Sequence, residues 1–217
     1  MNRIVLWFVK ITGWIPNLLY LRRKTYYVNN NKKIKKSKEA AVIISNHTSL
    51  IDFPLYMYTF PTTTLRPLVA EITYNKNPLM RTFLKLLGGI KVDRDSYDFS
   101  FMGECINALE KKDSVLIFPE GRLPKKDETD LLVFKPSFVY IALESNSPII
   151  PIYTNGKYGF KGKTRVIVGE KIYVSDLMDE NLTTEENINN ICNYFRDYII
   201  KLRDELNEKE KTNKKGI

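Results

Sequence analysis

The feature of this 217-residue chain that most constrains its fold is a series of short apolar runs that alternate with helical patterns. Within most of these runs successive residues are apolar, rather than every second one, which is typical of strands buried on both faces of a sheet. The runs lie at 41–45, 67–70, 90–92, 114–118 and 148–153, with candidate helices between them at 51–60, 77–87, 98–112 and 135–145. This alternation predicts a single α/β domain, with a mainly parallel sheet flanked by helices.

Two further patterns follow the last apolar run. Residues 164–168 and 171–174 look like strands on either side of Gly169, and they predict a hairpin that closes the sheet. Thr183 and Glu186 have the spacing of a capping box. Because apolar residues recur at helical intervals after this box, the sequence predicts a long amphipathic C-terminal helix.

The N-terminal segment, residues 1–24, is rich in Ile, Leu, Trp and Phe and ends in a basic cluster. Lys10, Gly13 and Pro16 interrupt it, so it falls short of the roughly 20 clean apolar residues that a spanning helix needs. It also lacks the small-residue cleavage site of a removed signal peptide. An apolar body with two tryptophans and a basic flank is typical of a helical segment in the membrane interface. A first helix packed on the core is the alternative interpretation.

No repeat or linker divides the remaining chain, which predicts one globular domain at 25–210 and a basic tail at 211–217. The net charge of +9 favours a polyanionic neighbour: nucleic acid, an anionic membrane or a phosphorylated substrate. Part of this charge lies at 32–38, where a solvated surface explains it equally well. Cys105 and Cys192 stand apart, which indicates a reducing compartment, and one histidine with two distant cysteines predicts no metal site.

Polar clusters follow three of the predicted strands. His47 follows the run at 41–45, the cluster KVDRD spans 91–95, and FPEGR spans 118–122. In open α/β sheets ligands bind at the carboxyl ends of the strands, so we expect the three clusters to meet at one edge of the sheet. The histidine and the aspartate five residues later, Asp52, do not by themselves distinguish a catalytic base from a polar residue that ends a buried strand.

The motifs of two common types of catalytic site are incomplete or missing. Residues 155–164 resemble a phosphate-binding loop, but Lys157 stands where that loop needs glycine, and a strand-like pattern follows in place of a helix. The chain also contains no Gly-x-Ser-x-Gly elbow. The sequence therefore does not predict a nucleotide triphosphatase or a serine hydrolase of that kind.

The stretches NHTSLID, GGIKVDR, FPEGR and PIIPIY, in this order, resemble the membrane glycerolipid acyltransferases. This is the family of 1-acylglycerol-3-phosphate (lysophosphatidate) acyltransferases and related glycerol-phosphate acyltransferases, and the likeness runs from about residue 40 to 175. The matching positions are His47, Asp52, Arg94, Glu120, Gly121 and Pro151.

The resemblance implies that His47 is a general base for the acceptor's hydroxyl, and that Asp52 fixes its tautomer and stabilises the imidazolium. It implies no serine nucleophile and no covalent acyl-enzyme, because the acceptor's own hydroxyl attacks the thioester. No cofactor is expected beyond the co-substrate, which is acyl-CoA or acyl-carrier protein.

The resemblance also implies a set of substrate-binding residues. Arg94 and Arg122 would bind a phosphate on the acceptor, and backbone amides around Gly121 would hold the phosphate or the developing oxyanion. Glu120 would contact a glycerol hydroxyl or orient an arginine. The chain departs from the family pattern where Arg122 follows Gly121 directly, and where Glu71 replaces a lysine that is frequent in relatives.

The function expected from the resemblance is transfer of a fatty acyl group to the free hydroxyl of 1-acylglycerol-3-phosphate, which gives phosphatidate in phospholipid biosynthesis. The protein would be associated with the cytoplasmic face of the cell membrane and would not bind nucleic acid. Three alternatives stay open: the same chemistry on glycerol 3-phosphate or another lysophospholipid, a thioesterase, and a non-catalytic membrane- or polyanion-binding protein.

Overall fold

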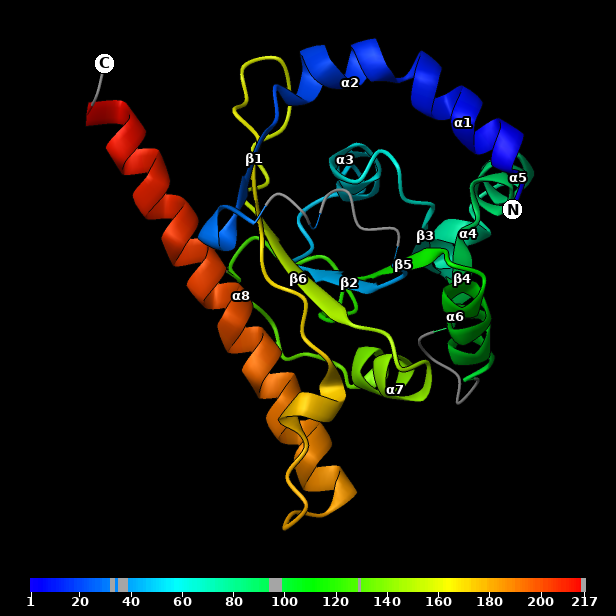
Figure 1. The fold of residues 1–217 in the computed structure, drawn as a ribbon. Helices are drawn as coiled ribbons and strands as arrows, with labels where there is room; N and C mark the ends of the chain where they lie inside the picture. The colour runs from blue at the N-terminus through cyan, green and yellow to red at the C-terminus, as the bar shows by residue number, and fades with distance from the viewer. Residues whose placement is uncertain (32–33, 35–38, 94–98, 129, 216–217) are drawn as a thin grey trace.

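A seven-stranded sheet in the order β1-β7-β6-β2-β5-β3-β4 forms the centre of the molecule (Figure 1). The computed structural model describes residues 1–31, 34, 39–93, 99–128 and 130–215. The strands are β1 (Lys24–Tyr27), β2 (Val42–Ser45), β3 (Leu65–Ala70), β4 (Ile90–Val92), β5 (Ser114–Ile117), β6 (Ile149–Thr154) and β7 (Arg165–Val168). All neighbouring pairs are parallel except β6 and β7. The predicted single α/β domain with a mainly parallel sheet is confirmed.

Helices cover both faces of this sheet (Figure 1). On one face lie α6 (Ser100–Glu110), α7 (Ser137–Glu144) and α8 (Thr184–Lys215), and on the other α2 (Trp14–Leu21) and α3 (Asp52–Thr59). The remaining helical elements are α1 (Arg3–Thr12), α4 (Glu71–Tyr74), α5 (Pro78–Leu87) and the 3₁₀ turns η1 (Val28–Asn30) and η3 (Val174–Leu177).

Strand β2 shows why the sequence reads as continuous apolar runs. Val42 and Ile44 pack into the core beneath α6, α7 and α8, whereas Ile43 packs against α2 and α3 on the opposite face. All three are at most 1% exposed. Successive side chains point to opposite faces, so a strand covered on both sides must be apolar at every position.

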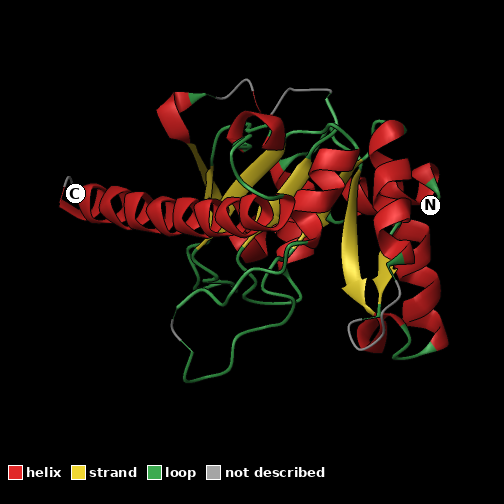
Figure 2. Ribbon diagram, turned by 90° about the horizontal axis from the view of Figure 1, so that it is seen from below, coloured by secondary structure: helices red, strands yellow, loops and turns green. Residues whose placement is uncertain are grey.

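Helix α8 begins at the predicted capping box. Glu186 Oε2 accepts a hydrogen bond from Thr183 N at 2.9 Å, and Thr183 Oγ1 accepts one from Glu186 N at 3.3 Å. The helix packs Leu202 and Leu206 against Ile167 of β7, and its C-terminal part projects beyond the sheet (Figure 2). Residues 211–215, expected as a tail, continue this helix.

The predicted hairpin at 164–168 and 171–174 is wrong. Strand β7 pairs with β6 and β1, while the second half forms only an isolated bridge between Ile172 and Ile149 before η3 begins. Two neighbouring strand-like segments do not indicate which strands they pair with. Strand β1 was not predicted at all.

The N-terminal segment forms the two helices α1 and α2, which lie across α3 (Figure 1). Leu6 and Leu21 are buried against the protein, and Lys10 Nζ donates to the carbonyls of Pro61 at 2.9 Å and Thr63 at 2.8 Å. Most other large side chains are more than half exposed: Ile4, Trp7, Phe8, Ile11, Trp14, Ile15, Leu18 and Leu19. The segment therefore packs on the core with one face and exposes an apolar outer face.

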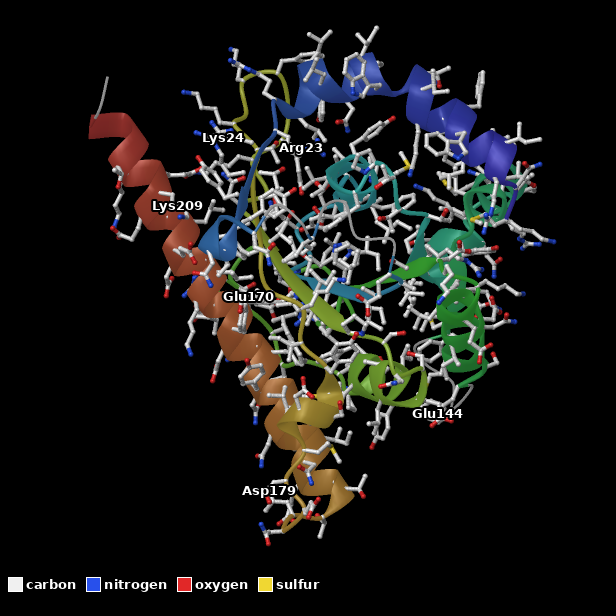
Figure 3. All side chains as sticks on the ribbon, in the orientation of Figure 1. Arg23, Lys24, Glu144, Glu170, Asp179 and Lys209 are labelled. Carbon is white, nitrogen blue, oxygen red and sulfur yellow. The ribbon has the colours of Figure 1, made fainter. Side chains whose placement is uncertain are left out.

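No single helix in the described part of the chain has the length and apolar character to cross a membrane. Helices α1 and α2 satisfy both criteria only as a pair, and a bend of 50° separates them. Arg23 and Lys24 follow at the junction of α2 and β1 (Figure 3). The basic run at 32–38 lies, apart from Ile34, outside the described residues.

Candidate functional site

Two of the predicted polar clusters meet where the parallel strands β2 and β5 end side by side. His47 follows β2 and Glu120 follows β5, and the His47 backbone N–H donates to Glu120 Oε1 at 2.9 Å. The third cluster follows β4, and its Asp93 lines the same cavity as His47. The expected convergence is confirmed for these residues, but Arg94 lies outside the described part of the chain.

The His47 and Asp52 side chains form a direct hydrogen-bonded pair. Nδ1 of His47 lies 2.8 Å from Oδ2 of Asp52, which is completely buried at the first turn of α3. The same oxygen accepts from the backbone N–H groups of Thr48 at 2.7 Å and Ser49 at 2.9 Å. A carboxylate only accepts hydrogen bonds, so the proton on the ring sits on Nδ1, and Nε2 has the lone pair that can accept a proton.

A stacked aromatic ring fixes the plane of the imidazole. Phe118 lies 4.0 Å from it between ring centroids, at an interplanar angle of 14°. The His47 side chain is 12% exposed and lines the cavity, so a substrate there can reach it although most of its surface is buried. With its plane set by Phe118 and its Nδ1 by Asp52, the ring is restricted to one orientation.

The structure adds two residues that sequence reasoning missed. Thr48 Oγ1 donates to Asp52 Oδ1 at 2.8 Å, and the Tyr158 hydroxyl donates to the same oxygen. Tyr158 belongs to the loop at 155–164 that resembles a phosphate-binding loop, and 106 residues separate it from Asp52. No local pattern could indicate that contact, because the pairing of β2 with β6 creates it.

Glu120 connects the His47 loop to a second loop. Its Oε2 accepts from the Leu132 N–H at 3.0 Å, and Arg196 of α8 holds the Leu131 and Leu132 carbonyls at 2.7 and 3.2 Å. Burial raises the pKa of Glu120, while the two backbone N–H donors act in the opposite direction. Both carboxylate oxygens thus bind backbone amides, and the predicted substrate contact of Glu120 stays a prediction.

Gly121 and Arg122 differ in their relation to the cavity. Gly121 has φ +72° in the turn closed by its own N–H and the Phe118 carbonyl at 2.9 Å, and it lines the cavity. Arg122 is exposed and makes a two-pronged ion pair with Glu128, with both N–O distances 2.6 Å. The hydrogen bonds from Arg122 and, to a smaller extent, from the Lys125 backbone N–H lower the pKa of Glu128 to about 2. The structure does not place Arg122 among the residues that line the cavity.

An apolar cavity of about 520 Å³ opens beside His47. Its walls come from α3, β3, α5, β4 and α6, with side chains such as Phe53, Leu68, Leu84, Val92, Phe101 and Met102. Lys135 lines it as well, and its Cε lies 3.0 Å from where a β-carbon on Gly121 would stand. A volume in the range of roughly 300–1,000 Å³ with few polar groups is typical of a small-molecule site.

The described residues contain no cluster of three or more His, Cys, Asp or Glu side chains placed to hold a metal ion. Cys105 and Cys192 are separate, buried thiols. Burial raises the pKa of Cys105 to about 12 and that of Cys192 to about 11. The expectation of a reaction without metal or cofactor stays a prediction.

Comparison with known proteins matches residues 25–155 to the family model described as Acyltransferase. The chain is 35% identical over 121 residues to a 1-acyl-sn-glycerol-3-phosphate acyltransferase of Cocos nucifera, covering 54% of this chain and 38% of that protein. It is 29% identical over 149 residues to the human 1-acyl-sn-glycerol-3-phosphate acyltransferase beta, covering 63% and 52%. The chain thus matches between about two fifths and half of the length of these relatives.

A solved structure with a similar fold is the crystal structure of the 1-acyl-sn-glycerophosphate (LPA) acyltransferase of Thermotoga maritima. The TM-score is 0.66, with 18% sequence identity, and the match covers 93% of this chain and 80% of that chain. At this identity the likeness bears on the fold alone. It supports the single α/β domain with a mainly parallel sheet.

Proposed function

Because the chain belongs to the acyltransferase family, whose model matches more than half of it, we propose that it acylates the free hydroxyl of 1-acylglycerol-3-phosphate to give phosphatidate. The observation that carries the proposal is the oriented His47–Asp52 pair beside an apolar cavity. The relatives named as 1-acyl-sn-glycerol-3-phosphate acyltransferases support the choice of acceptor.

The reaction follows from the tautomer that Asp52 imposes. Nε2 of His47 takes the proton of the acceptor's hydroxyl while that oxygen attacks the thioester carbonyl. The tetrahedral intermediate then collapses, the carbon–sulfur bond breaks, and the leaving thiolate receives the proton from the imidazolium. The Asp52 carboxylate stabilises the imidazolium between these two transfers. Since the acceptor supplies the nucleophile, no residue of the chain needs to be acylated.

The cavity suits the acyl chain of a donor such as acyl-CoA or acyl-carrier protein. Its lining is mainly aliphatic and aromatic, and burial of an acyl chain gives about 0.8 kcal/mol per methylene. Cationic side chains would bind the acceptor's phosphate. Arg94 fits that role by family position, and Lys135 supports it by lining the cavity. Arg122 would first have to leave Glu128.

We also place the protein at the cytoplasmic face of a membrane, with the exposed apolar face of α1 and α2 in the interface. Such a face binds lipid through buried apolar area, and the exposed basic side chains of Arg22 and Lys24 would favour anionic lipids (Figure 3 labels Lys24). Arg23 instead turns inward and donates to the Leu55 carbonyl and the Thr59 hydroxyl of α3. A Phe8→Ser, Ile11→Ser, Leu18→Ser variant should stay folded and lose most binding to anionic vesicles.

The matched control for this vesicle experiment is Leu182→Ser. Leu182 is also an exposed apolar residue, and it lies in the segment after Asp179, at the opposite end of the molecule (Figure 3). This control should bind vesicles as the unchanged protein does. Full binding of the triple variant would contradict a membrane role for α1 and α2.

The function is tested with purified protein, labelled oleoyl-CoA or oleoyl-acyl-carrier protein, and a panel of acceptors resolved by product chromatography. We expect labelled phosphatidate from 1-acylglycerol-3-phosphate. Preferred labelling of glycerol 3-phosphate or of another lysophospholipid would show that this compound is the acceptor. Release of free oleate alone would indicate a thioesterase. Donor binding with no product from any acceptor would contradict an enzymatic role.

A further inference from the structure

The loop at 155–164 reaches across the sheet edge to the His47–Asp52 pair, and none of the motifs considered above accounts for it. We propose that Tyr158 in this loop is a positioning residue for acyl transfer: its hydroxyl bond to Asp52 Oδ1 fixes the carboxylate and sets how strongly Asp52 holds the His47 imidazolium. This role rests on the proposed function of the pair as a general base.

The loop is built to bring Tyr158 to Asp52. The Asn155 side-chain oxygen accepts from the backbone N–H of Lys157 at 3.2 Å and of Arg165 at 3.0 Å, which ties the two ends of the loop together. Asn155 Nδ2 donates to Glu210 of α8 at 3.0 Å, so the loop is also held from outside the sheet. The loop is thus held both at its ends and by α8.

Gly156 permits the close approach of the loop to the pair. Its φ is +64°, a conformation that strongly favours glycine, and an added β-carbon would lie 3.0 Å from the Cβ and Oγ1 atoms of Thr48. Thr48 in turn donates to Asp52 Oδ1, and its hydroxyl lies 3.2 Å from that of Tyr158. The loop therefore sits on the turn that carries the catalytic pair.

The two oxygens of Asp52 have different partners. Oδ2 faces His47 Nδ1 and two backbone N–H groups, whereas Oδ1 receives the hydroxyls of Tyr158 and Thr48. Burial, and next the Asp52 charge, raise the pKa of Tyr158 well above its ordinary value, so the hydroxyl keeps its proton and remains a donor. Without this donor, more of the negative charge of Asp52 would be available to the imidazolium.

Four other charged or titratable groups lie near the pair or line the cavity with it. Glu120 accepts a hydrogen bond from the His47 backbone, and Asp93 and Lys135 line the cavity with His47. Burial, and next the Asp52 charge, raise the pKa of Tyr56 in α3. A Tyr158→Phe substitution leaves all of these in place. It removes a single oxygen atom, so a change in the titration of His47 reports on the bond to Asp52.

The sign of the effect follows from this arrangement. A carboxylate with one donor fewer attracts the imidazolium more strongly, so His47 in Tyr158→Phe should hold its proton to higher pH. We expect the titration midpoint to rise by about 0.5–1 pH unit, which corresponds to about 0.7–1.4 kcal/mol. Less of His47 is then the neutral base at neutral pH, so kcat should fall there by no more than about three- to tenfold. The pH at which kcat is half of its plateau should rise by the same amount as the midpoint, with KM for both substrates unchanged.

The titration can be followed by NMR without assignment, because His47 is the only histidine in the sequence. The matched control is Tyr173→Phe, since Tyr173 also donates its hydroxyl to a carboxylate, that of Glu39. Glu39 precedes the N-terminal end of β2, whereas His47 follows the C-terminal end. Tyr173→Phe should leave both midpoint and kcat unchanged. Melting temperatures show that each variant is folded, and the NMR result is independent of whether the acceptor is correctly identified.

A second variant moves the hydroxyl without deleting it. Gly156→Ala should displace the loop from Thr48 and raise the midpoint in the same direction by a smaller amount. It also serves if Tyr158→Phe does not fold. An unchanged midpoint and kcat in folded Tyr158→Phe would overturn the positioning role, as would an unchanged midpoint in Gly156→Ala if only that variant folds. A shifted midpoint in a protein that transfers no acyl group would overturn the proposed function and leave the coupling of Tyr158 to His47 intact.

Discussion

Replacing Asp52 by Asn separates the catalytic role of this residue from its structural one. Asp52 is fully buried and accepts five hydrogen bonds, three at Oδ2 and two at Oδ1. An asparagine can keep its oxygen toward the three N–H donors and turn its NH₂ toward the hydroxyls of Thr48 and Tyr158, which also accept. The network can therefore persist in Asp52→Asn.

The stability cost of this change should be small. Bonds to a neutral acceptor are weaker than bonds to a carboxylate by about 1 kcal/mol each, but the variant no longer buries a charge, which offsets much of that loss. We expect a net loss of about 1–2 kcal/mol in the free energy of unfolding. For a chain of this size that lowers the melting temperature by about 2–8 °C.

The catalytic cost should be larger, because an amide cannot stabilise an imidazolium. We expect kcat to fall by about 10²–10⁴, or about 3–5.5 kcal/mol in the activation barrier, with little change in KM. His47→Ala should be at least as inactive, and adding Asp52→Asn to it should cost little more, because the two side chains act as a unit.

Initial rates of acyl transfer beside circular dichroism melts decide between the two roles. A folded Asp52→Asn protein with near-normal kcat would refute the general-base mechanism, as would activity in folded His47→Ala. Fully additive losses in the double variant would show that the two residues act separately. If the pair had only a structural role, melting temperatures would fall and rates would not.

Three further predictions concern the acceptor's phosphate and the two thiols, the one on Arg94 resting on its family position. Arg94→Ala should raise KM for a phosphate-bearing acceptor about ten- to a hundredfold while hydrolysis of the donor by water continues, and an unchanged KM would remove Arg94 from the site. Lys135→Ala should raise the same KM more than Arg122→Ala, because Lys135 lines the cavity and Arg122 is paired with Glu128; the reverse order in acceptor kinetics would contradict this assignment. Cys105 and Cys192 should resist a thiol reagent at pH 8 in the folded protein, since raised pKa values of about 12 and 11 leave few thiolates, and both should react in denaturant; rapid labelling of the native protein would show that their surroundings open.

The sheet could be predicted from the sequence because most of its strands are buried on both faces. The strand expected at 90–92 is observed as Ile90–Val92, and the other four differ by at most two residues at either end. Strand β1 (Lys24–Tyr27) escaped notice because it is an edge strand in which only Tyr27 is buried. Its partner β7 lies about 140 residues further along the chain, so no local pattern indicates the pairing.

The site could be predicted only as far as its residues follow strand ends. The positions of His47, Glu120 and Gly121 after buried strands are visible in the sequence, whereas Asp52 was singled out only by the family motif, because its spacing from His47 alone does not indicate a contact. Tyr158 was not, since its contact with Asp52 depends on how β6 lies beside β2. The Arg122–Glu128 ion pair also depends on the path of an irregular loop, which spacing alone does not define.

The strand order has a consequence for how the protein loses activity on warming. Strand β2, which carries His47 at its end, is the fourth of seven and is hydrogen-bonded to β5 on one side and β6 on the other. Tyr158 comes instead from the connection between β6 and β7, near the edge formed by β1. Local opening of loops and chain ends costs less free energy than opening of core strands, so it precedes global unfolding. Amide exchange should therefore reach the Tyr158 loop first, and heat inactivation should begin while the strand that carries the histidine is still protected.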